Sequence, residues 1–374
     1  MKETIGGNLT RYRKGLGLSQ EALAEKVGVT IERIENYENA KILPDSKTLS
    51  ALARALDVTL DNLLRSQSFG DATSSSMELP DFRFRAHGSF KENPQFTARV
   101  RRMLETYNAI EAAVGVPPFA PETLSCDRLE GKEKLIQATA TRFRGSFGLG
   151  DIAVPNLFQA VEKLGLKVLR QPIEIRGFFG ISACSLARGA FVIVNTHDIT
   201  IERQLFTLAH ELGHLIFHRD EYGDNLMKKG SKEAEKAREK VADYFASHLL
   251  IPQTEFDLVY QYDRNILQLK QHFRVSYQVI LTRLAEMGAI DYQQEINKIR
   301  AIYKNRHGSP LKNSMELPPA LKAEDFPENQ RYRQLIWQVL DKGKISELKA
   351  AELLNLTVEE LRILRQEAEV YAIS

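Results

Sequence analysis

The stretch FTLAHELGHLIFHRD, residues 206–220, holds three of the eight histidines of a 374-residue chain within nine positions. On an α-helix, His210 and His214 lie one turn apart on the same face, where both imidazoles can hold one metal ion. Glu211 follows the first histidine and can reach a water molecule on that ion. The HExxH spacing therefore predicts two zinc ligands and a general base, whereas the alternative is a buried helix with incidental polar residues.

A hydrolytic zinc needs a third protein ligand and an open fourth position. His218 is a poor candidate because it lies eight residues, about 12 Å, beyond His210 along the helix axis. A surface position or a supporting contact suits it better. A later helix offers Glu235 and Glu239, and periodicity alone does not choose between them. Asp243 favours Glu239, because it follows four residues later on the same side and can accept a hydrogen bond from a ligating histidine.

Composition is that of an ordinary soluble globular protein, with 27% charged and 43% hydrophobic residues. No apolar run approaches the roughly 18 residues of a membrane span, and the N-terminus lacks the apolar core of a signal peptide. The two cysteines, Cys126 and Cys184, have no CxxC spacing, which argues against a disulfide framework or a cysteine zinc site. We therefore expect a cytoplasmic protein with no membrane contact.

The segment LSQEALAEKVGVTIERIENYENAK, residues 18–41, predicts two short helices joined by a tight turn. Ser19 caps the first helix, Gly28 ends it and Thr30 caps the second. Ile34 and Tyr37 then face inward. Two short helices joined by a glycine turn at this spacing form a helix-turn-helix.

The charge of this segment gives DNA binding little support. Residues 1–66 hold ten Lys or Arg against nine Asp or Glu, and the whole chain has a net charge of only +2. Phosphates repel the carboxylates of Glu32 and Glu35 in the second helix. Arg11, Arg13 and Lys14 are the side chains that we expect to hold backbone phosphates. A helix-turn-helix kept for dimerisation or for docking a partner is the alternative.

Periodicity and composition predict an α+β fold that is predominantly helical. The runs GFFGISACSL and GAFVIVN are rich in aromatic and β-branched residues and predict strands of a small sheet. Long helical patterns follow at 201–218, 232–250 and 264–287. We expect four segments: a five-helix helix-turn-helix domain at 1–66, a linker and connecting helix at 67–120, a domain with the small sheet at 121–290, and a helical C-terminal region with a helix-turn-helix-like pattern at 291–374.

Three stretches resemble the ImmA/IrrE family of metallopeptidases: FGLGDIAVPNLFQAVEKLGLKVL, ITIERQLFTLAHELGHLIFHRD and EKVADYFASHLLIP. The resemblance covers roughly residues 128–290. It implies a zincin-like domain with zinc, or manganese in its place, on His210, His214 and Glu239, and with Glu211 as the base.

Two more positions match the family pattern. Arg203 stands where the family has an arginine upstream of the metal helix, and Asp243 stands where it usually has asparagine. We expect both to support the metal site. The family activity implied here is site-specific cleavage of a repressor protein, which switches on stress-response or mobile-element genes.

Residues 5–65 resemble the phage-repressor (Xre/Cro) family of helix-turn-helix domains. The resemblance implies operator DNA as a partner, and we expect a homodimer because half-sites mirror two-fold symmetry. The side chains expected to contact DNA are Arg13, Gln20, Thr30, Ile31, Glu32, Arg33, Glu35 and Asn36.

These patterns together predict a zinc-dependent regulatory endopeptidase fused to a helix-turn-helix domain, with a repressor-type protein as its substrate. Two alternatives stay open. One is a transcriptional regulator or antitoxin whose peptidase-like domain senses a ligand or partner without proteolysis. The other is a toxin–antitoxin or phage-defence component in which the N-terminal domain restrains the rest. An intact Glu211 favours the enzyme, because a purely structural metal site has no use for a base.

Overall fold

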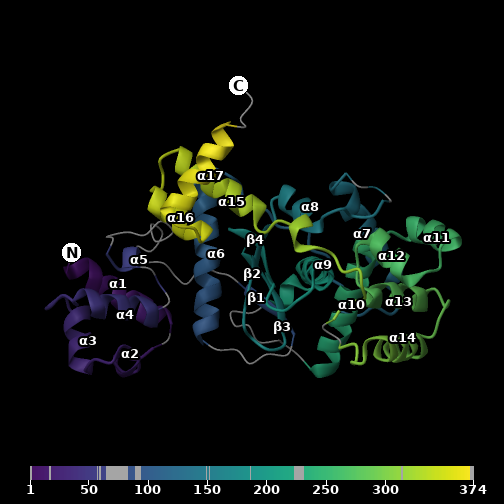
Figure 1. Ribbon diagram of the computed structural model, residues 1–374, viewed down its shortest axis with the longest axis horizontal. Helices are drawn as coiled ribbons and strands as arrows, with labels where there is room; N and C mark the ends of the chain where they lie inside the picture. Colours follow the sequence, from purple (N-terminus) through teal and green to yellow (C-terminus); the bar gives the residue numbers. More distant parts are fainter. Residues whose placement is uncertain are drawn as a thin grey trace. The chain divides into compact units, whose positions relative to one another are not determined.

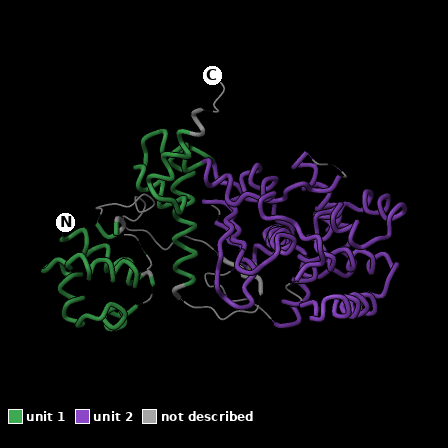
Figure 2. Tube along the Cα trace, viewed as in Figure 1, with its two compact units in different colours: residues 1–80, 91–116, 335–374 green, residues 81–90, 117–334 purple. Residues whose placement is uncertain are grey.

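The computed structural model describes residues 2–16, 18–56, 58, 60–64, 83–88, 94–148, 150, 152–185, 187–222, 231–312 and 315–370. The chain forms two compact units (Figure 2). Unit 1 contains residues 1–80, 91–116 and 335–374, and unit 2 contains residues 81–90 and 117–334. The serine-rich segment 65–80, which we expect to be a linker, falls within the sequence range of unit 1 but lies outside the described residues.

Unit 1 begins with the five helices expected of the helix-turn-helix domain. They are α1 (Lys2–Gly15), α2 (Gln20–Val27), α3 (Ile31–Glu38), α4 (Ser46–Ala55) and α5 (Leu60–Leu64). The helix ends follow the predicted chemistry, because Ser19 accepts a hydrogen bond from the Ala22 amide and Gly28 is left-handed at φ 74°. Thr30 caps α3 through the Arg33 amide. Ile34 and Tyr37 are buried, as expected.

The rest of unit 1 is also helical, with α6 (Pro94–Val114), most of α15 (Gln330–Asp341), α16 (Glu347–Leu354) and α17 (Val358–Val370). The turn between α16 and α17 repeats the turn between α2 and α3. Ser346 caps α16, Asn355 is left-handed at φ 56°, and Thr357 accepts a hydrogen bond from the Glu360 amide. The helix-turn-helix-like pattern in the sequence is therefore confirmed as a helix–turn–helix in space.

Unit 2 is built around a four-stranded sheet of order β1-β3-β4-β2 (Figure 1). Its strands are β1 (Arg83–Gly88), β2 (Lys167–Gln171), β3 (Phe178–Ser185) and β4 (Gly189–Asn195). β3 pairs antiparallel with β1 and β4, whereas β2 runs parallel to β4. All of β4 is buried, which agrees with its β-branched and aromatic composition.

The metal helix predicted from the sequence, α9 (Ile201–Phe217), packs on β3 and β4 on one side and on α10 (Lys232–Leu250) on the other. α7 (Glu133–Ser146) packs against α10. The core of unit 2 includes Leu205, Leu208, Leu212, Leu215 and Phe245. The remaining helices of this unit are α8 (Leu157–Lys163), α11 (Gln253–Tyr262), α12 (Ile266–Phe273), α13 (Tyr277–Glu286) and α14 (Tyr292–His307), with short 3-10 turns at Arg219–Glu221 and Ala323–Asp325.

The single helix predicted over 264–287 is wrong, because α12 and α13 are separate. Arg274 takes the left-handed conformation at φ 54°, which ends α12. Ser276 then caps α13 by accepting a hydrogen bond from the Val279 amide. The serine is a helix-start signal that competes with the continuous apolar pattern. Across the part of the chain that the structure describes, no helix has both the length and the apolar character of a membrane span.

Candidate metal centre

Two buried histidines on α9 form the centre of the site. Thr200 starts the helix by capping the Arg203 amide, and the helix then runs uninterrupted through both histidines. His210 and His214 are 0% and 1% exposed, and their Nε2 atoms lie 2.9 Å apart. The spacing of four residues thus brings the two rings together, as the sequence predicts.

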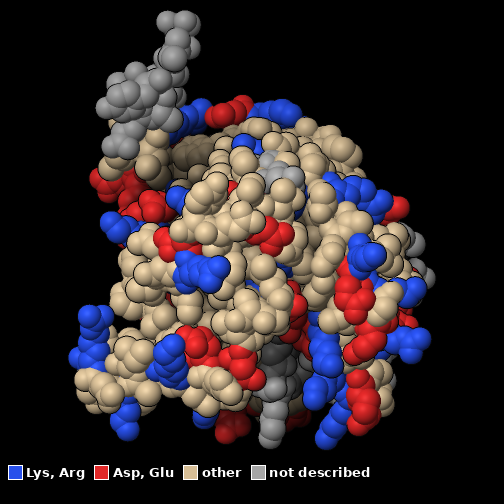
Figure 3. Space-filling model, turned by 90° about the vertical axis from the view of Figure 1, so that its right-hand side faces the viewer, with Lys and Arg blue, Asp and Glu red and all other residues tan. Residues whose placement is uncertain are grey.

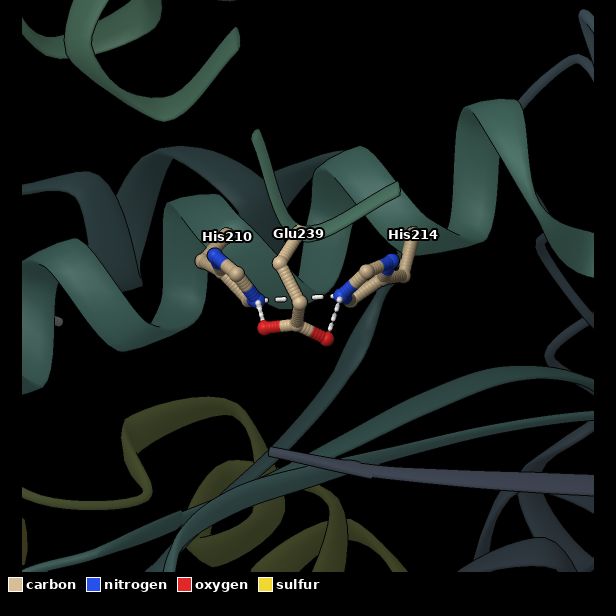
Figure 4. A group of neighbouring side chains, drawn as sticks. All are labelled: His210, His214 and Glu239. Carbon is tan, nitrogen blue, oxygen red and sulfur yellow. Dashed lines mark hydrogen bonds and ion pairs between the residues drawn. The ribbon is translucent and has the colours of Figure 1, made fainter. Parts of the chain in front are cut away.

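The third donor comes from α10 (Figure 4). Glu239 places Oε2 3.3 Å from His210 Nε2 and Oε1 3.5 Å from His214 Nε2. The ligand atoms of the three side chains all lie within 4.8 Å of one another. Glu235 instead pairs with Arg238 at 3.3 Å on the same helix. The structure therefore selects Glu239 from the two glutamates between which periodicity does not choose.

A glycine lets α10 approach this closely. A Cβ atom on Gly213 would lie 3.2 Å from both Ala242 Cα and Phe245 Cδ1. Contacts of this length are tight, so a side chain at this position would push α9 and α10 apart. Because Glu239 lies on α10 and the histidines lie on α9, the glycine helps to set the distance between the donors.

The donor set fits a small divalent cation. Nitrogen and oxygen ligands about 2.0–2.2 Å from a tetrahedral zinc lie roughly 3.3 Å from each other. The measured separations of 2.9, 3.3 and 3.5 Å bracket that value. Burial lowers the pKa of His210, but hydrogen bonds to Asp243 and Glu239 outweigh it and raise the pKa to about 9. The surroundings of this ring therefore favour positive charge, whether of a proton or of a metal.

Asp243 takes the supporting position predicted for it. Its Oδ1 lies 2.8 Å from His210 Nδ1, on the ring edge opposite Nε2. Arg203 lies with its guanidinium 4.4 Å from the ring centre of Phe179. Burial lowers the pKa of Arg203, and the charge of Asp243 opposes that shift. The arginine thus contributes positive charge on the Asp243 side of the site.

Glu211 faces the sheet and has a partner that the sequence analysis missed. Ser182 on β3 donates to Glu211 Oε2 at 2.5 Å, and the Tyr222 hydroxyl lies 2.7 Å from Ser182 Oγ. All three side chains are buried. A carboxylate only accepts hydrogen bonds, so Ser182 donates to it and Tyr222 donates to Ser182. A serine in the middle of a mostly apolar strand is the signal that could have pointed to Ser182.

Family models match two separate parts of the chain. The model described as helix-turn-helix matches residues 9–63, and the model described as Peptidase_M78, IrrE N-terminal-like domain, matches residues 161–285. The second range contains all three candidate ligands. The chain joins a helix-turn-helix DNA-binding domain to an IrrE-like metallopeptidase domain.

Curated relatives match the helix-turn-helix domain. The HTH-type transcriptional regulator YqaE of Bacillus subtilis strain 168 is 41% identical over 61 residues, which are 16% of this chain and 53% of that protein. The SPbeta prophage-derived HTH-type transcriptional regulator YonR of the same organism is 38% identical over 61 residues, which are 16% of this chain and 56% of that protein. The chain thus spans about half the length of these relatives. Among solved structures, the apo form of ComR from S. thermophilus is 13% identical, with a TM-score of 0.17 and coverage of 98% of this chain and 99% of that one.

A cavity of about 1050 Å³ lies in unit 2, and none of His210, His214, Glu239 and Glu211 lines it. Arg203 and Asp243 line it, and Asp243 connects it to His210. Arg176, Arg300 and Glu286 also lie on its wall, so the cavity offers both signs of charge. Tyr277 and Arg283 are buried at 1% and 0% exposure and do not line this cavity.

The helix-turn-helix domain corrects one expectation about DNA. Arg13 is only 8% exposed, and its guanidinium donates to both carboxylate oxygens of Glu38, at 2.6 and 2.8 Å, and to the Leu18 carbonyl. Gln20 also donates to Glu38. A guanidinium held in this way cannot take the phosphate-binding role predicted for Arg13, because its donors point into the domain.

The other residues predicted to contact DNA are more accessible. Thr30, Ile31, Glu32, Arg33 and Glu35 are exposed, whereas Asn36 is half-buried. On the face of unit 2 drawn in Figure 3, basic and acidic side chains of the described residues are interspersed. Such mixed charge gives a polyanion no continuous attraction on this face. The helix-turn-helix domain is the part of the chain that implies DNA binding.

Proposed function

We propose that the chain is a zinc-dependent regulatory endopeptidase that cleaves a repressor-type protein and is fused to a DNA-binding domain. The observation that carries this proposal is the cluster of His210, His214 and Glu239, with Glu211 directly beside the first ligand. Three protein ligands leave one position for water or substrate, which distinguishes a catalytic zinc site from a structural one.

When bound, zinc lowers the pKa of water and polarises a peptide carbonyl. His210, His214 and Glu239 hold the ion in this proposal. Glu211 accepts a proton from the attacking water and returns it to the leaving amine. Ser182 restrains Oε2 of Glu211, so the proton is expected to move through Oε1.

The cavity supports a peptide as the substrate. Its volume of about 1050 Å³ lies just above the range usual for small-molecule pockets, roughly 300–1,000 Å³. Arg176, Arg203 and Arg300 can bind carbonyl groups or acidic side chains, and Glu286 can bind amide or basic groups. A wall with donors and acceptors of both kinds suits a peptide backbone better than an apolar ligand.

We also propose that the helix-turn-helix domain binds an inverted operator repeat as a homodimer. Ile31, Glu32, Arg33 and Glu35 are the exposed side chains of α3 that would lie in the major groove, with Asn36 beside them. Footprinting at low salt tests this proposal, and a lack of any protected site would favour partner docking instead.

The peptidase proposal is tested by Glu211→Gln. Glutamine keeps the shape of the side chain but cannot take a proton from water. Cleavage of a co-expressed repressor encoded beside the gene should fall by on the order of 10² to 10⁴. Metal content should stay at about one ion per molecule, because Glu211 is not a ligand. The matched control is Glu162→Gln, which changes another buried glutamate of the same unit.

Three readouts separate the outcomes: a gel for the cleavage product, a reporter for repressor activity, and elemental analysis for the metal. A product with wild type and Glu162→Gln but not with Glu211→Gln supports the peptidase. If wild type and Glu211→Gln both retain metal, give no product and drive the reporter equally, the protein is a regulator that senses through this domain without proteolysis.

A further inference from the structure

A buried histidine lies directly behind one of the candidate metal ligands. His218 follows the last residue of α9, four residues after His214, and is 1% exposed. Its Nδ1 lies 2.8 Å from Nδ1 of His214. Its other ring nitrogen, Nε2, lies 2.9 Å from the carbonyl oxygen of Cys126. Both nitrogens of His218 therefore contact the protein: Nδ1 contacts His214 on the side of that ring away from His210 and Glu239, and Nε2 contacts Cys126.

The Cys126 carbonyl, together with a neutral His218, determines the direction of these hydrogen bonds. A carbonyl oxygen only accepts, so Nε2 of His218 must carry its hydrogen and donate it. A neutral imidazole with its hydrogen on Nε2 has a lone pair on Nδ1. His214 must then donate from Nδ1 to reach it. As a result, Nε2 of His214 presents a lone pair toward His210 and Glu239, which is the form that a metal requires.

The carbonyl itself is held in place by the end of α9. The amide of Leu124 donates to the Ile216 carbonyl at 2.7 Å, and the amide of Cys126 donates to the Phe217 carbonyl at 3.4 Å. The loop that carries the acceptor and the helix that carries the ligand are therefore joined by backbone hydrogen bonds. We call the hydrogen bonds from His214 to His218 and from His218 to the Cys126 carbonyl the relay. Its geometry depends on the fold and does not depend on an exposed side chain.

The two histidine ligands are supported in different ways. His210 has the carboxylate of Asp243, whose side chain is 54% exposed. His214 has the imidazole of His218, which is only 1% exposed. A side chain that orients a ligand from behind typically changes metal affinity by about 10–100-fold when it is removed.

We propose that His218 is a positioning residue that fixes the tautomer of His214 through the Cys126 carbonyl. This inference rests on the proposed metal site. It gives the third histidine of the HELGHLIFH stretch a defined role, although it does not bind the metal.

Two substitutions separate the two halves of the relay. Asparagine at 218 can place its carbonyl oxygen near the position of Nδ1 and accept from His214, but it cannot reach the Cys126 carbonyl. Glutamine can place its amide nitrogen near the position of Nε2 and donate to Cys126, but it offers no acceptor near Nδ1. His248→Gln is the control, because His248 is a buried histidine on α10 that faces Glu286 at 3.5 Å.

The first measurement is the zinc dissociation constant of the full chain, by competition with a chromophoric chelator. His218→Gln should weaken zinc binding by about 10–100-fold, whereas His218→Asn and His248→Gln should stay within about threefold of wild type. Equal losses in the asparagine and glutamine variants would indicate that His218 only fills space. No loss in the glutamine variant would also overturn the proposal.

The second measurement is the tautomer of His214 in metal-free protein, from the ¹⁵N chemical shifts of its ring. The relay requires the hydrogen on Nδ1 in the wild type and in His218→Asn. A hydrogen on Nε2 in the wild type refutes the relay, even if zinc binds. If the wild type binds no zinc, the proposed metal function fails and the tautomer still decides about the relay. The wild-type tautomer also decides the question if the glutamine variant does not fold.

Discussion

The hydrogen bond between Ser182 and Glu211 makes a quantitative prediction that needs no substrate. Both side chains are 0% exposed, and the donor and acceptor lie 2.5 Å apart. The perturbation is Ser182→Ala, introduced into wild type and into Glu211→Gln. In the second background the acceptor is a neutral amide oxygen, so only the charge of the acceptor differs.

The expected size follows from burial and charge. A hydrogen bond to a charged group contributes about 1.5–3 kcal/mol, and a bond between neutral groups contributes about 1 kcal/mol. Neither value needs reduction for solvent screening, because water does not reach Ser182 or Glu211. We expect Ser182→Ala to lower the free energy of unfolding by about 2–3 kcal/mol in wild type and by about 1 kcal/mol in Glu211→Gln.

The assay must report on unit 2. The single tryptophan, Trp337, is half-buried and belongs to unit 1, so its fluorescence is unsuitable. Hydrogen exchange of α9 peptides at increasing urea measures the correct region. Ser185→Ala is the control, since Ser185 is buried in the same strand and points to the opposite face. Equal losses in the two backgrounds would refute a charged bond between Ser182 and Glu211.

Two further predictions concern packing and pH. A Cβ on Gly180 would lie 2.6 Å from Thr207 Cγ2, so Gly180→Ala should lower the free energy of unfolding by about 1–3 kcal/mol. Adding Thr207→Ser removes the clashing methyl group and should restore part of that loss. Equal urea midpoints for the single and double variants would contradict this prediction. Burial raises the pKa of Glu162 to about 7, from an ordinary value of 4.5. Below the ordinary value both folded and unfolded chains hold the proton, and above it the folded chain loses stability as pH rises through 7. The free energy of unfolding of Glu162→Gln should therefore exceed that of wild type by on the order of 1–3 kcal/mol near pH 8, but not near pH 4. A difference in thermal midpoint between the two proteins that does not change with pH would contradict this prediction.

Spacing along one helix proved sufficient to predict part of the metal site. His210 and His214 are related by helical periodicity alone, and Asp243 stands one turn after Glu239 on a second helix. Such local relations survive folding because an α-helix fixes them. The five helices of the N-terminal domain were predictable for the same reason, since their caps are local signals such as Ser19.

Contacts between distant segments could not be predicted in this way. Glu211 accepts a hydrogen bond from Ser182, which lies 29 residues away in the sequence. His218 contacts the carbonyl of Cys126, which lies 92 residues away. Arg13 was expected to hold a DNA backbone phosphate, but its guanidinium instead donates to Glu38, which lies 25 residues away in sequence. Periodicity contains no information about which segments meet, so these partners follow only from the fold.

The C-terminal helix pair shows why helix-turn-helix geometry alone does not imply DNA binding. Residues 335–374 hold five basic and seven acidic side chains, so phosphates would be repelled on average. Arg362 and Arg365 on α17 pair with Glu347 and Asp341, at 2.6 and 3.2 Å. By contrast, Arg33 on α3 is exposed in a domain whose basic residues slightly outnumber its acidic ones. The two pairs share their capping pattern and differ in the charge that a DNA backbone would meet, and this difference favours α2 and α3 over α16 and α17 for DNA binding.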